Sequence, residues 1–140
     1  MYLDITQKAR EDESKSKQKS SVSAVKKHTF FLDGNLLNVD EQRKLNEFYE
    51  KNDAHWKLIY KAKRDGFRGR NFHSQCDTRG PTMTIIKSKG DGYVFGGYTA
   101  CPWSLDDGRK TDPTAFLFTI RNPHGLEMTK FKIGQHLSGQ

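Results

Sequence analysis

The sequence predicts an α+β domain built on an antiparallel sheet. Segments with strand patterns follow one another closely along residues 82–133, and helical patterns precede them at 38–52 and 69–77. In the hairpin and the strand after it, apolar side chains occupy successive positions and therefore face both sides of the sheet. Such a sheet needs cover on both faces, either from a second sheet or from helices.

The first helix has a marked start. Asn38 can cap it, and Glu41, three residues later, completes a capping box. Leu45, Phe48 and Tyr49 then fall on one face at helical spacing. This pattern predicts an amphipathic helix over 38–52.

A strand and a second, shorter helix follow. Residues 55–63 alternate, with Trp56 and Leu58 on one face and lysines on the other. After a turn at an Asp-Gly pair, residues 69–77 suit a short helix that places Cys76 on its inner side.

A hairpin is predicted from residues 82–88 and 93–99, with further strands at 114–120 and 126–133. The second strand of the hairpin carries the adjacent pair Gly96–Gly97. Two glycines in a strand remove side chains and cost backbone entropy. We therefore expect a bulge, a bend or another segment packed against this backbone.

The N-terminal region differs in composition from the rest. Residues 1–28 contain seven basic and four acidic residues, and apolar residues are sparse between positions 8 and 23, which predicts a disordered basic tail before a foldable region at 29–140. The net charge of +7 permits an alternative function as a basic surface binder of nucleic acid or anionic membrane. No apolar run could span a membrane, and two cysteines without a secretion signal predict reduced thiols in an intracellular, cytoplasmic protein.

No residue pattern predicts a catalytic, cofactor or metal site. His73 and Cys76 have the spacing of two zinc ligands, but Cys101 and His124 lack the tight spacing of a second pair. The sequence also lacks a nucleophile elbow and a phosphate-binding loop. We expect a binding module rather than an enzyme, with a thiol-dependent antioxidant that uses Cys76 or Cys101 as the competing interpretation.

A series of ordered motifs occupies residues 56–120. Residues 56–103 read WKLIYKAKRDGFRGRNFHSQCDTRGPTMTIIKSKGDGYVFGGYTACPW, and DPTAFLFTI follows at 112–120. This order of motifs closely resembles the TLDc domain. The resemblance implies an antiparallel two-sheet β-sandwich flanked by helices. It also implies that residues 29–140 form a partial TLDc-like domain, roughly its first two thirds, with incomplete sheets.

The same resemblance implies a function. TLDc proteins are linked to protection from oxidative stress and to binding of the vacuolar proton-pumping ATPase, so it implies a non-catalytic module that binds a protein partner, with subunits of that pump as candidates. We expect the contact surface on the charged loop 64–70 and the long loop 100–113. The alternative is that Arg64 and Asp65 simply pair with groups of their own domain. Four arginines in these loops offer planar donors to an acidic partner: Arg64, Arg68, Arg70 and Arg109.

Overall fold

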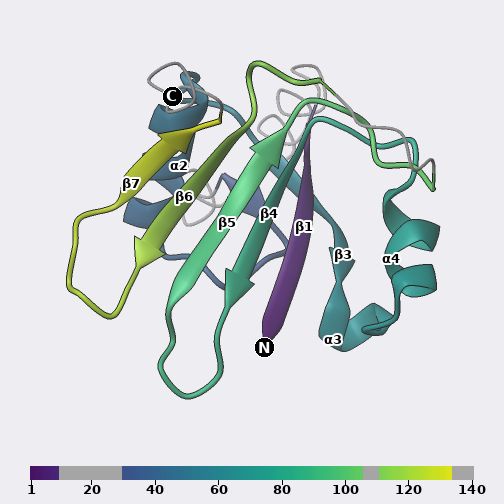
Figure 1. Cartoon of the computed structure of the whole chain (residues 1–140), viewed down its shortest axis with the longest axis horizontal. Helices are drawn as coiled ribbons and strands as arrows, with labels where there is room; N and C mark the ends of the chain where they lie inside the picture. The colour runs from purple at the N-terminus through teal and green to yellow at the C-terminus, as the bar shows by residue number, and fades with distance from the viewer. Residues whose placement is uncertain (10–29, 106–110, 134–140) are drawn as a thin grey trace, which may run out of the picture.

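The strands that the structure describes form one mixed sheet (Figure 1). The computed structural model describes residues 1–9, 30–105 and 111–133. Its strands are β1 (Tyr2–Lys8), β2 (Phe31–Leu32), β3 (Trp56–Lys61), β4 (Thr82–Lys87), β5 (Val94–Thr99), β6 (Phe116–Arg121) and β7 (Thr129–Lys132). Its helices are α2 (Val39–Tyr49), α3 (Ala62–Asp65) and α4 (Gly69–Cys76). The seven described strands lie in the order β2-β3-β1-β4-β5-β6-β7, and only the β2–β3 pair is parallel.

The α+β class is confirmed, but the two-sheet sandwich is wrong. All the strands that the structure describes belong to a single sheet. Apolar residues on both faces of β4–β6 suggested that a second sheet packs against the first. In the structure, helices pack against the sheet instead. Figure 1 shows α2 behind the β5–β7 part of the sheet and α3 and α4 beyond β3 at the other end.

The prediction of a disordered tail over residues 1–28 is wrong for residues 2–8. They form β1, which lies in the middle of the sheet and pairs with β3 on one side and β4 on the other. Ile5 and Thr6 are almost fully buried. The many charged residues after Lys8 dominate the composition of residues 1–28. The short alternation of apolar residues before Lys8 was therefore not interpreted as a strand. Residues 10–28, the remainder of the predicted tail, lie outside the described residues.

Helix α2 covers one face of the sheet. The predicted capping box is present, because Asn38 Oδ1 accepts from Glu41 N at 2.8 Å and Glu41 Oε1 accepts from Asn38 N at 2.9 Å. Glu41 also receives two hydrogen bonds from the Arg121 guanidinium, at 2.6 and 2.7 Å, which join the start of α2 to β6. The core beneath α2 centres on Trp56, whose Nε1 donates to Asn46 Oδ1 at 3.0 Å.

The opposite face is covered only in part. A second core cluster joins Ile5, Ile59 and Cys76, with Phe72 of α4 and Trp103 packed against it. Trp56 is fully buried, whereas Trp103 remains partly exposed. Over β5–β7, large apolar side chains on this face are exposed: Phe95, Leu117 and Phe131.

The glycine pair of β5 serves close packing. A Cβ on Gly96 would overlap the carbonyl oxygen of Thr84 and come within 2.7 Å of the Phe118 ring. A Cβ on Gly97, which faces the other way, would lie 3.0 Å from Leu117. The register shift of β5 occurs between Val94 and Phe95 instead of at the glycines. Of the three explanations expected for the pair, the close approach of neighbouring groups is therefore the one observed.

Candidate functional site

The predicted contact loop at 64–70 forms a tight corner at one end of the sheet. We call residues 63–70 the α3–α4 corner. Helix α3 follows β3 without an intervening loop, and Gly66 then reverses the chain with φ of +113°. The Tyr60 hydroxyl donates to the Gly66 carbonyl, and Asn71 Oδ1 accepts from Arg68 N at 3.1 Å. These two bonds fix the backbone of the corner to its own scaffold.

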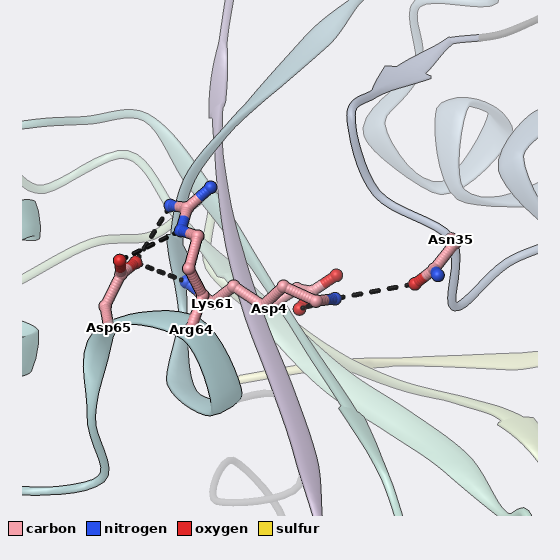
Figure 2. Close-up of polar contacts among 5 residues, drawn as sticks. All are labelled: Asp4, Asn35, Lys61, Arg64 and Asp65. Carbon is pink, nitrogen blue, oxygen red and sulfur yellow. Dashed lines mark hydrogen bonds and ion pairs between the residues drawn. The ribbon is translucent and has the colours of Figure 1, made fainter.

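Arg64 is engaged within the domain. Its Nε and Nη2 donate to the two Asp65 carboxylate oxygens at 2.9 and 2.8 Å (Figure 2). Asp65 Oδ2 also accepts from Lys61 N at 3.0 Å. The hydrogen bonds from Arg64 are the main reason that the pKa of Asp65 lies below its usual value. Arg64 thus pairs within its own domain, as the alternative prediction proposed, and the structure identifies Asp65 as the residue that largely offsets its charge.

A second polar contact lies beside this pair and was not found from the sequence. Asp4 of β1 is almost fully buried, and Lys61 Nζ bonds to its Oδ1 at 3.2 Å and to Asn35 Oδ1 at 3.4 Å (Figure 2). Burial raises the pKa of Asp4 despite the nearby ammonium group. Because the sequence assigned Asp4 to a tail, no sequence signal linked it to Lys61.

Other side chains of the corner are exposed to solvent, among them those of Phe67, Arg68 and Arg70. Arg68 and Arg70 are exposed, and neither forms an ion pair with a residue that the structure describes. Phe67 lies between these arginines and Arg64 along the chain and is 62% exposed. An exposed aromatic residue next to exposed arginines in the chain has the composition of a protein-binding hot spot.

The second predicted loop, 100–113, is anchored at both described ends. Trp103 packs edge-on against Phe72 of α4 at 5.0 Å between ring centroids, and its Nε1 donates to Thr82 Oγ1 at 2.9 Å. At the far end, Asp112 accepts from Ala100 N and Thr99 Oγ1 at 2.7 and 2.8 Å. Arg109 lies outside the described residues.

The ordered motifs quoted from residues 56–120 thus build one connected scaffold from β3 through α4 to β6. The sequence profile of the TLDc domain matches residues 30–136. The chain belongs to the TLDc domain family. The match excludes β1, so a strand from outside the matched region completes the middle of this TLDc sheet.

Several relatives of this TLDc chain share one name, MTOR-associated protein MEAK7. The chain is 30% identical to the MTOR-associated protein MEAK7 of Danio rerio over 71 residues. This alignment covers 51% of the chain and 16% of the relative. The Mus musculus protein of that name is 31% identical over 65 residues, 46% of the chain and 14% of the relative. The Xenopus laevis protein is 30% identical over 98 residues, 67% of the chain and 20% of the relative. The chain therefore matches a fifth or less of the length of these relatives.

The two thiols of the TLDc chain occupy different environments. Cys76, the last residue of α4, is fully buried, and burial raises the pKa of its thiol to about 12, which disfavours the reactive thiolate. Cys101 is partly exposed, and its Sγ donates to the Thr111 carbonyl at 3.7 Å. It lines a groove of about 520 Å³ together with Trp103, Leu117 and Ile133.

The polar residues considered for metal binding are not assembled. His73 Nδ1 lies 2.7 Å from Asp77 Oδ1, one helical turn away. Across residues 1–9, 30–105 and 111–133, no group of three or more histidine, cysteine or acidic side chains could hold a metal ion. Within the same residues, no helix has the length and apolar character needed to cross a membrane.

Proposed function

We propose that this chain is a non-catalytic TLDc module that binds a protein assembly. The observation that carries the proposal is the α3–α4 corner, where Phe67, Arg68 and Arg70 face solvent on a backbone held by its own hydrogen bonds. A rigid scaffold that presents exposed aromatic and arginine side chains suits recognition of another protein.

The leading candidate partner is the peripheral sector of the vacuolar proton-pumping ATPase, as the family resemblance implies. Protection from oxidative stress would then follow from control of the pump, and the site of action would be cytoplasmic. An assembly that contains MTOR is the second candidate, because the relatives are named for their association with MTOR. These relatives support binding to a protein assembly without defining which one this chain contacts.

The competing thiol function depends on Cys101. It is the cysteine that reaches a surface groove, whereas burial disfavours ionisation of Cys76. A Cys101→Ser variant removes this thiol and leaves the α3–α4 corner unchanged. The binding function predicts that this variant retains its partner and its stress protection.

The test uses the full chain immobilised on a sensor surface and purified peripheral sector of the pump in solution. We expect saturable binding by wild type and by Cys101→Ser. Absence of binding to the pump sector and to a purified MTOR complex, together with loss of peroxide survival in cells that carry Cys101→Ser, would replace the binding function with the thiol function.

A further inference from the structure

We infer that the α3–α4 corner is a docking surface for an acidic protein segment that also carries an apolar side chain. This inference rests on the proposed function, because it names the chemistry of the partner that the module would bind. It assigns the contact to Phe67, Arg68 and Arg70, and it gives Arg64 a structural role.

The charge of the corner favours an acidic partner. Four of its eight residues are basic and one, Asp65, is acidic. The carboxylate of Asp65 is bound by Arg64, and the Lys63 ammonium lies 5.6 Å from the centre of the Tyr2 ring. Arg68 and Arg70 are therefore the cations best placed to reach a partner. Each guanidinium can donate two parallel hydrogen bonds to one carboxylate.

The geometry of the corner adds an apolar contact. Phe67 is 62% exposed at the point where the chain turns from α3 into α4. Phe67 directly precedes Arg68 in the chain, so a segment that pairs carboxylates with Arg68 and Arg70 can also contact this ring. An aliphatic or aromatic side chain of the segment can then remove the ring from water, which is the larger contribution to affinity.

The same observations favour a protein segment over a membrane or a nucleic acid. Each basic residue near an anionic membrane increases binding only about fivefold, so two available arginines and one ring hold a membrane weakly. The affinity for nucleic acid increases with the number of phosphates that the protein neutralises, and two arginines neutralise only about two. An arginine that donates two parallel hydrogen bonds needs a carboxylate held in a fixed orientation. A folded or docked protein segment can hold its carboxylates in this way.

The experiment measures binding of the full chain to a fluorescent peptide of alternating glutamate and leucine, by anisotropy. The isosteric glutamine–leucine peptide, phosphatidylserine vesicles and a single-stranded RNA serve as the other probes. We expect Arg68→Glu/Arg70→Glu to lose at least about tenfold in affinity for the glutamate peptide, and Phe67→Ser to lose several-fold. We expect Arg68→Lys/Arg70→Lys to lose affinity too, because lysine keeps the charge without the planar fork.

The matched control is Arg43→Glu/Lys132→Glu, which changes the net charge equally on exposed positions of α2 and β7, away from the corner (Figure 1). It should bind the glutamate peptide like wild type. Equal losses in the control and the corner variant would overturn the inference in favour of net charge alone. Binding to vesicles or RNA that survives the lysine variant, without binding to the glutamate peptide, would overturn it in favour of those surfaces. Binding to the pump sector that is unaffected by Arg68→Glu/Arg70→Glu would overturn the inference while leaving the proposed function intact.

Discussion

The first described strand, β1, lies in the middle of the sheet, whereas the last, β7, lies at its edge. β1 pairs on both sides, and its residues Asp4, Ile5 and Thr6 are buried. β7 pairs on one side with β6, and its Phe131 is 53% exposed. Yet β7 has the clearer strand sequence, and β1 has the sequence that was assigned to a tail. The difference teaches that the contribution of a strand depends more on its place in the sheet than on the strength of its pattern.

Deletion of residues 1–9 tests this difference most severely. Without β1, the backbone groups of β3 and β4 lose their partners, and the sheet is divided into two parts. We expect the truncated chain to lose cooperative thermal unfolding as followed by circular dichroism. A truncated chain that melts like the full chain would show that β1 contributes little.

Trp56→Ala should destabilise the β1–β3–β4 part of the sheet by about 3–5 kcal/mol, because it leaves a large cavity. Trp56 is fully buried, stacks on Phe31 at 5.6 Å and contacts Tyr49 and Tyr98. The measurement is urea unfolding of the full chain. A loss below about 1 kcal/mol would contradict burial of this ring in the core.

Asp112→Asn tests the loop that precedes β6. Burial alone would raise the pKa of Asp112, but hydrogen bonds from Thr114, Thr99 and Ala100 together lower it to about 2. A lowered folded pKa means that the carboxylate adds stability above its unfolded pKa, near 4, and that this stability is lost as the pH falls toward 2. We expect the variant to lose about 1 kcal/mol at neutral pH, because solvent screens this partly exposed carboxylate, and to converge with wild type in acid, in urea titrations at several pH values.

Asp4→Asn should show the opposite pH dependence with a smaller amplitude. Burial raises the folded pKa of Asp4, so its ionisation costs stability as the pH rises from the unfolded value through the folded one. We expect wild type to gain stability relative to the variant as the pH is lowered toward 4, with a difference within about 1 kcal/mol at neutral pH because Asn can still accept from Lys61. If the free energy of unfolding changed with pH in the same way for both proteins, the Lys61 ammonium would fully offset the effect of burial on the pKa of Asp4.

Leu117→Ala should have the smallest effect. This side chain lies on the uncovered face over β6, is 54% exposed and pairs across the sheet with Phe131. We expect a loss below about 1 kcal/mol in urea unfolding. A loss as large as that of Trp56→Ala would indicate that this face is covered in solution.

Several elements were predictable because their signals are local. The capping box at Asn38 and Glu41 depends on a spacing of three residues, and the hairpin of β4 and β5 depends on adjacent strands and a glycine turn. The exposed arginines of the corner also follow from a local charged turn. The place of β1 between β3 and β4 was not predictable, because its partners are distant in the chain and the charged residues after Lys8 dominate the composition.

The sequence by itself determined the α+β class, the family motifs and the candidate arginines, since these depend on residue type and short spacing. Only the tertiary structure decided that a single sheet replaces the sandwich and that Arg64 is bound by Asp65 while Arg68 and Arg70 remain exposed. It also placed Asp4 beside Lys61, and it packed Cys76 of α4 into the core with Ile5 and Ile59. Burial and ion pairing are properties of residues brought together across the fold, and the spacing of residues along the chain does not specify them.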